Sequence, residues 1–138
     1  MINTKTIQIQ ILRPQGIFCQ KRVTSINFPD SDGQRAVLYD HAPFICLIGD
    51  GIITLKKHSD KEQHFYIEGG LLEVKKNFVI ILTQKIHEAK EFEQKELEDQ
   101  LTKLRQHPYN DQLELQQKNQ NIHRLQSKLK LITLSQNC

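Results

Sequence analysis

The residues that could do chemistry in this chain are scattered along its length. Glu68 and Glu73 flank a diglycine and could act as paired carboxylates in acid–base chemistry, but their setting is more typical of strand-edge or interface acids. The histidines lack the His-x-x-x-His spacing or cysteine pair of a metal site, and the cysteines lack metal-like or redox spacing. These residues are His41, His58, His64, His87, His107, His123, Cys19, Cys46 and Cys138. The sequence therefore predicts no catalytic, cofactor-binding or metal-binding residue.

A change of composition near Gln84 divides the chain into two predicted units. Before it, apolar and polar residues alternate and three of the four prolines occur, whereas the residues after it include no glycine and favour helices. Such a change indicates strands followed by helices. We predict a mainly β plus α protein with a β-sandwich domain over residues 1–84 and an antiparallel two-helix hairpin over residues 85–138.

Turn residues interrupt the first unit at short intervals, which is typical of a sandwich. Ile7, Ile9 and Ile11 alternate with glutamines, as expected of a half-buried strand. Turns are expected at residues 13–16, 29–33, 49–51, 59–61, 69–70 and 76–77. The longest apolar run, residues 78–82, is too short for a transmembrane helix, and the N-terminus lacks a signal-peptide core.

Leucines at helical spacing define the second unit. Leu97, Leu101 and Leu104 share one helical face, residues 107–110 end that helix, and residues 111–114 resemble a capping box that begins the next. The apolar stripe of the second helix is Leu115, Ile122, Leu125, Leu129 and Ile132. Because this seam is small beside the entropy lost in ordering both helices, we expect the hairpin to require docking on the sandwich or on a partner.

The two predicted helices differ in charge. The first is acidic overall and the second is basic, so the arms can attract each other. Lys118, Arg124 and Lys128 on the second helix are candidates for docking on an acidic surface, although a merely solvated basic face is an equal alternative from the residues alone. The net charge of +3 does not by itself indicate a nucleic-acid partner.

Several short segments, in their order, resemble the epsilon subunit of F-type ATP synthases. They include Ile11-Leu12-Arg13-Pro14, Asp32-Gly33-Gln34, Asp40-His41-Ala42-Pro43, Gly49-Asp50-Gly51 and Gly69-Gly70-Leu71-Leu72. The resemblance is dense over residues 7–83 and reaches the hairpin only through length and helical character. It implies a sandwich of about ten strands that binds the gamma subunit and rests on the c-subunit ring. It also implies a hairpin that lies against the sandwich or extends beside gamma, near the catalytic beta subunits, where it blocks ATP hydrolysis.

The resemblance assigns roles to individual residues. Asp32, Gly33 and Gln34 match the loop that contacts the c ring, with Gln34 in place of the usual glutamate. His41 matches an interface or loop-ordering position near the same end of the sandwich. Pro43, Gly69 and Gly70 match structural turn positions. These matches imply a noncatalytic rotor subunit.

Some members of this family bind ATP through an aliphatic-Asp-x-x-Arg-Ala motif at the start of the first helix. The corresponding positions here are Phe92-Glu93 and Glu96-Leu97, so an acid stands where the phosphate-binding arginine would be. We therefore expect no direct ATP binding and no cofactor.

The rotor interpretation implies a peripheral position on the cytoplasmic face of a bacterial inner membrane or, as the alternative, on the stromal side of a plastid thylakoid membrane.

The competing hypothesis is a β-sandwich adaptor or RNA-binding module that presents a coiled-coil hairpin. Steeply salt-dependent binding to nucleic acid would favour that hypothesis, whereas the rotor interpretation expects no nucleic-acid partner.

Overall fold

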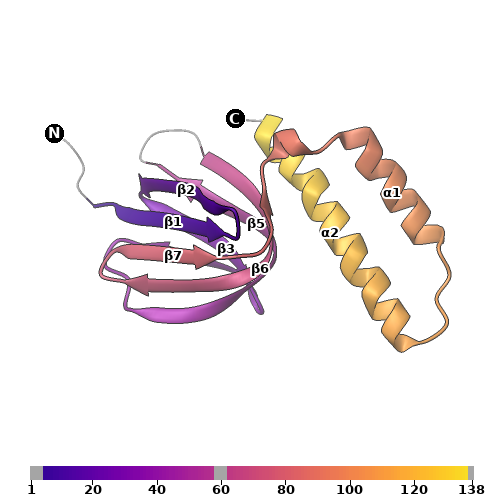
Figure 1. Ribbon diagram of the computed structural model, residues 1–138, viewed down its shortest axis with the longest axis horizontal. Coiled ribbons are helices and arrows are strands. Elements are labelled where there is room, and N and C mark those ends of the chain that lie inside the picture. The colour runs from indigo at the N-terminus through magenta and orange to yellow at the C-terminus, as the bar shows by residue number, and fades with distance from the viewer. Residues whose placement is uncertain (1–4, 58–61, 137–138) are drawn as a thin grey trace.

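A computed structural model describes residues 5–57 and 62–136. The expected turn at residues 59–61, His58 and Cys138 lie outside these ranges. Figure 1 shows the strands gathered into one body and the two helices side by side, with α2 between the sheet and α1. The strands are β1 (Ile7–Arg13), β2 (Gly16–Val23), β3 (Ser25–Asp30), β4 (Gly33–Leu38), β5 (Phe44–Lys56), β6 (Glu62–Lys75), β7 (Phe78–Leu82) and β8 (Ile86–His87). A short 3-10 helix, η1 (Ala89–Glu91), precedes α1 (Gln94–Gln106) and α2 (Gln112–Gln136).

The described strands form one sheet in the order β2-β1-β7-β6-β5-β3-β4, with β8 paired to β6. β1 and β7 run parallel, and the other pairs within the described residues are antiparallel. The alternation at the N-terminus is confirmed, since Ile7, Ile9 and Ile11 are all fully buried in the core. The predicted class, a β-sandwich followed by two helices, is confirmed.

Glycines bend β5 and β6 instead of ending them, so the breaks expected at residues 49–51 and 69–70 are wrong. Both strands continue through these points, and Asp50 pairs with Glu68 between them. The alternation of core-facing residues shifts by one position at each bend. In β5, even-numbered residues such as Ile48 face the core before the bend, and odd-numbered residues such as Ile53 face it afterwards. The described part of the chain therefore contains eight strands, and counting each bent strand twice accounts for the expected ten.

A tight turn and a helix cap lie where the sequence predicts them. Lys76 and Asn77 both have positive φ and join β6 to β7 with Lys75 paired to Phe78. At the start of α2, the backbone N–H of Glu114 donates to Asp111 Oδ1 at 2.8 Å, and the N–H of Asn110 donates to Glu114 Oε2 at 2.8 Å. The expected cap of Asp111 on Glu114 is thus present, whereas the Glu114 side chain bonds the N–H of Asn110 and not that of Asp111, as a full capping box would require.

The hairpin has an apolar seam of its own. Its buried residues are Leu97, Leu101, Leu125 and Ile132, with Phe92, Leu104, Ile122 and Leu129 packed around them. The sandwich extends beyond the expected boundary at residue 84, because Ile86 is fully buried in its core and β8 pairs with β6. The α-helical part begins at Gln94.

The close approach at Gly70 generates a first prediction. A Cβ at Gly70 would lie 2.6 Å from the Leu82 carbonyl oxygen, at a φ of +154°. Gly70→Ala should therefore lower the free energy of unfolding by about 2 kcal/mol or more, measured by urea denaturation. Gly16→Ala is the matched control, since Gly16 has a φ of +121° with no atom within 4 Å of the added Cβ. Equal losses in the two variants would contradict the steric explanation.

Candidate functional site

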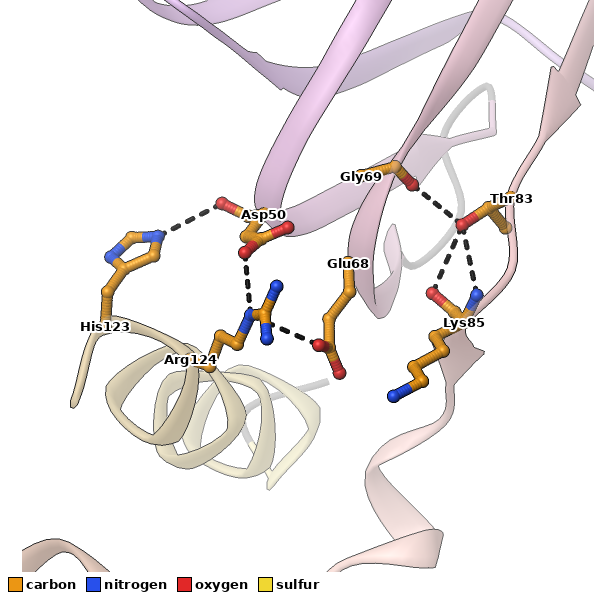
Figure 2. Close-up of polar contacts among 7 residues, drawn as sticks. All are labelled: Asp50, Glu68, Gly69, Thr83, Lys85, His123 and Arg124. Atoms are coloured by element: carbon orange, nitrogen blue, oxygen red, sulfur yellow. Dashed lines mark hydrogen bonds and ion pairs between the residues drawn. The ribbon is translucent and has the colours of Figure 1, made fainter. Parts of the chain in front are cut away.

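The strongest polar contact between the hairpin and the sandwich lies where β5 and β6 bend. Arg124 of α2 places its Nε 2.8 Å from Asp50 Oδ2 and 3.1 Å from Glu68 Oε1, as Figure 2 shows. The side chains of Asp50 and Glu68 are only 16% and 12% exposed, and that of Arg124 is 31% exposed. The hydrogen bond to Asp50 and the two carboxylate charges raise the pKa of Arg124, so the guanidinium is charged.

The backbone around this ion pair is fixed by hydrogen bonds to the segment that follows β7. Thr83 Oγ1 donates to the Gly69 carbonyl oxygen at 2.7 Å (Figure 2). The Glu68 N–H donates to the Lys85 carbonyl oxygen at 3.0 Å. On the other side, His123 Nε2 donates to the Asp50 carbonyl oxygen at 3.1 Å. The carboxylates are therefore held in place by strand geometry, which sequence reasoning could not have foreseen.

Aromatic rings form the second part of the surface on which α2 docks against the sandwich. Lys128 Nζ lies 5.4 Å from the centroid of the Tyr66 ring and 5.2 Å from that of Phe92, within cation–π range. Leu131 is fully buried against Tyr66 and Ile52. Burial, followed by the charges of Glu68 and Asp50, holds the pKa of Tyr66 well above its ordinary value.

All three predicted docking cations contact groups within the chain itself. Lys118 Nζ donates to the carbonyl oxygens of Arg105 at 3.0 Å and His107 at 2.8 Å, and so caps the C-terminus of α1. Arg124 and Lys128 face the sandwich. The two acidic residues that pair with Arg124 were not singled out as its partners because they are distant in sequence.

Glu68 and Glu73 both lie on β6 and do not face each other. Glu68 lies opposite Asp50, whereas Glu73 lies opposite Ile45 and Ile80. The interpretation of these residues as strand acids with no shared chemistry agrees with this register.

The residues proposed for the c-ring contact lie at the turn between β3 and β4. Asp32 lies in the turn and is exposed, as are Gly33 and Gln34 at the start of β4. An open groove of about 420 Å³ separates this turn from α2, and its lining includes Gln34 and Lys130. The turn is therefore accessible to a partner.

His41 and Pro43 lie beyond the opposite end of β4, so the expectation that His41 shares an end with Asp32 is wrong. A six-residue strand separates the two loops. The loop before β5 is fixed instead to the β6–β7 turn, where the Asp40 N–H donates to Asn77 Oδ1 at 2.6 Å. The His41 ring packs on Phe44, with 4.8 Å between centroids.

An exposed apolar row was not foreseen from the sequence. Leu47, Leu71 and Leu82 lie directly opposite one another on β5, β6 and β7 and are 75%, 38% and 46% exposed. Ile45, on the same strand as Leu47, is also exposed. Neighbouring exposed apolar residues are typical of an interaction surface. The alternation of apolar and polar residues is visible in the sequence. Which of these residues face the solvent depends on the bends in β5 and β6, which the sequence did not predict.

The fold and these contacts define a class of protein: a β-sandwich that carries a two-helix hairpin docked on its bent strands. Residues 6–89 match the family model described as the ATP synthase delta/epsilon chain β-sandwich domain. The chain belongs to this family, as an epsilon-type chain of F-type ATP synthase. The processes associated with this family are ATP synthesis and ion transport.

Curated relatives agree with this assignment. The ATP synthase epsilon chain of Chlorobium limicola is 34% identical over 82 residues, which span 59% of this chain and 93% of the relative. That of Pelagibacter ubique is 28% identical over 116 residues, 83% of this chain and 88% of the relative. That of Leptospira borgpetersenii is 34% identical over 77 residues, 56% of this chain and 60% of the relative.

Solved structures share the fold. A chain in the Euglena gracilis mitochondrial ATP synthase, in a structure of its OSCP, F1 and c-ring parts, superposes with a TM-score of 0.71 at 19% identity, covering 99% of this chain and 83% of that one. A chain from the central stalk and c ring of the Tetrahymena thermophila enzyme gives a TM-score of 0.61 at 13% identity, covering 97% and 98%. Among the described residues, no helix is long and apolar enough to cross a bilayer.

The buried phenol of Tyr66 generates a prediction on pH. Since its pKa is raised in the folded chain, the folded state keeps a proton that the unfolded state loses, and the free energy of unfolding should fall as pH rises above about 10. Tyr66→Phe keeps the ring and should flatten this fall, measured by urea denaturation between about pH 8 and pH 11. Tyr109→Phe, at an exposed position, is the control. Identical pH profiles for wild type and Tyr66→Phe would contradict the assignment.

Proposed function

We propose that the chain is a noncatalytic rotor subunit of the central stalk of a proton-translocating F-type ATP synthase. In this role it binds gamma and the c ring and so couples proton flow to ATP synthesis. The family match over the whole sandwich carries the proposal. The exposed apolar row supports it, because a subunit held permanently in a complex needs such a surface.

Two surfaces of the sandwich suit two partners. The row of Leu47, Leu71 and Leu82 suits the gamma subunit, since the core of a stable interface is apolar. The turn that contains Asp32, Gly33 and Gln34 suits the polar loops of the c ring. With Gln34 neutral, that contact uses hydrogen bonds in place of an exposed ion pair, a difference of about 0 to 1 kcal/mol. His41, beyond the other end of β4, supports its loop through Phe44.

The hairpin acts as a conditional inhibitor of ATP hydrolysis. In the docked state, Arg124 and Lys128 contact the sandwich, so they can address an acidic surface of the catalytic beta subunits only after α2 leaves. Docking and inhibition are then exclusive states of one hairpin, and a partner that binds the released form shifts the population toward it.

The start of α1 suggests that ATP does not govern this switch directly. Glu93 is the N-cap of α1, and Glu96 lies in its first turn. A carboxylate at a helix N-terminus is stabilised by the helix dipole but repels a phosphate that would otherwise bind there. The subunit is peripheral on the cytoplasmic face of a bacterial inner membrane, with the stromal side of a thylakoid membrane as the alternative.

Binding to a gamma-containing catalytic complex tests the rotor assignment. Wild type should bind tightly and stoichiometrically, and Leu47→Glu should weaken the affinity about thirtyfold, as for an interface hot spot. Leu38→Glu is the control, because Leu38 is also an exposed leucine but lies on β4, which among the described strands pairs only with β3 and so is outside the row. Absence of wild-type binding would refute the rotor assignment, and equal losses in both variants would refute the location of the gamma contact.

Truncation tests the inhibitory role. The chain should be cut after Glu93, because Ile86 belongs to the sandwich core and a cut at residue 84 would remove it. The shortened subunit should still assemble, and ATP hydrolysis by the reconstituted complex should rise. Unchanged hydrolysis would refute inhibition by the hairpin and leave the coupling role.

A further inference from the structure

The contact between α2 and the sandwich is small in its apolar part. Its buried cluster consists of Ile52, Tyr66 and Leu131, with Ala89, Phe92 and Leu134 packed around them. The polar part is more specific, because Arg124 reaches one carboxylate on each of the two bent strands. One side chain thereby connects the hairpin to both β5 and β6.

The two carboxylates require a cation at this place. Asp50 and Glu68 lie opposite each other in the β5–β6 ladder, and both are mostly shielded from water. Like charges at directly opposite positions destabilise a sheet pair, and burial weakens solvent screening. The guanidinium of Arg124 compensates both charges, whereas its departure leaves them facing each other.

The docking face of α2 is separate from the face that forms the hairpin seam. Arg124, Lys128 and Leu131 have the i, i+4, i+7 spacing of one helical face and contact the sandwich. Leu125 and Ile132 belong to the seam with α1. Phe92 packs against both clusters, but the four buried seam residues belong to the hairpin alone, so the hairpin can leave the sandwich with this seam intact.

From this arrangement we infer that Arg124 is an electrostatic latch: its contact with Asp50 and Glu68 sets the fraction of chains whose hairpin is docked. Release of the latch exposes the cationic face of an intact hairpin and uncovers an anionic pair on the sandwich. The inference deepens the proposed switch by identifying the residues that control it, and it rests on that proposal only for its biological meaning.

Thiol labelling of the isolated full-length chain tests the latch. Leu131→Cys introduces a thiol that is buried by the sandwich, so its labelling rate measures release of the hairpin. Leu125→Cys introduces one that is buried by the seam, so its rate measures opening of the hairpin itself. Peptide mapping by mass spectrometry separates these thiols from the native cysteines.

The latch predicts different responses at the two positions. Adding Arg124→Gln should speed labelling at the Leu131→Cys thiol about tenfold or more, and Arg124→Lys should have a smaller effect, since a lysine keeps the charge but loses the planar fork. The Leu125→Cys thiol should label at an unchanged rate. Lys103→Gln, an equal charge change on the exposed side of α1, is the control and should alter neither rate.

Neutralising the carboxylates completes the test. In a background of Asp50→Asn and Glu68→Gln, Arg124→Gln should change the labelling rate less than about threefold, because its partners are already gone. Equal rates in Arg124→Gln and Lys103→Gln would overturn the latch, and so would equal acceleration at the seam thiol. The measurement needs no ATP synthase, so its failure is distinguishable from failure of the rotor assignment.

Discussion

The bends in β5 and β6 are the constraint on which the rest of this structure depends. Each strand changes its core-facing side at a glycine, which allows one strand to line both halves of the sandwich. At Gly70 the backbone comes so close to Leu82 that a side chain has no room. The same bends bring Asp50 opposite Glu68 at the surface where α2 docks. Core closure and hairpin docking thus share one local geometry.

The hairpin combines two weak associations on adjacent faces of one helix. The seam with α1 is apolar, with a charge-assisted cap from Lys118, and the contact with the sandwich is partly ionic and partly aromatic. The apolar part of the contact with the sandwich is limited to a small cluster around Leu131, so its release exposes less apolar area than separation of a large apolar interface would. This property suits the proposed release of α2 from the sandwich, whereas a large apolar interface would oppose it.

Features that depend on neighbouring residues in the chain were predicted correctly from the sequence. The alternating isoleucines, the Lys76-Asn77 turn and the cap at Asp111 depend on neighbours in the chain, and all three are present. Breaks at the glycines were wrongly expected because a glycine that ends a strand and one that bends it look alike until the partner strand is known. The partners of Arg124 are 74 and 56 residues away in the chain, and only the folded sheet brings them together.

The surfaces proposed for assembly and for switching lie on different parts of the same two strands. The exposed apolar row lies on the first half of β5 and the second half of β6, whereas α2 covers the second half of β5 and the first half of β6. Because the bends separate these regions, a partner bound to the row need not displace the hairpin, and a released hairpin need not weaken that partner. The separation fits the proposed function, because a rotor subunit with a regulatory hairpin must stay attached to its partner while the hairpin changes state.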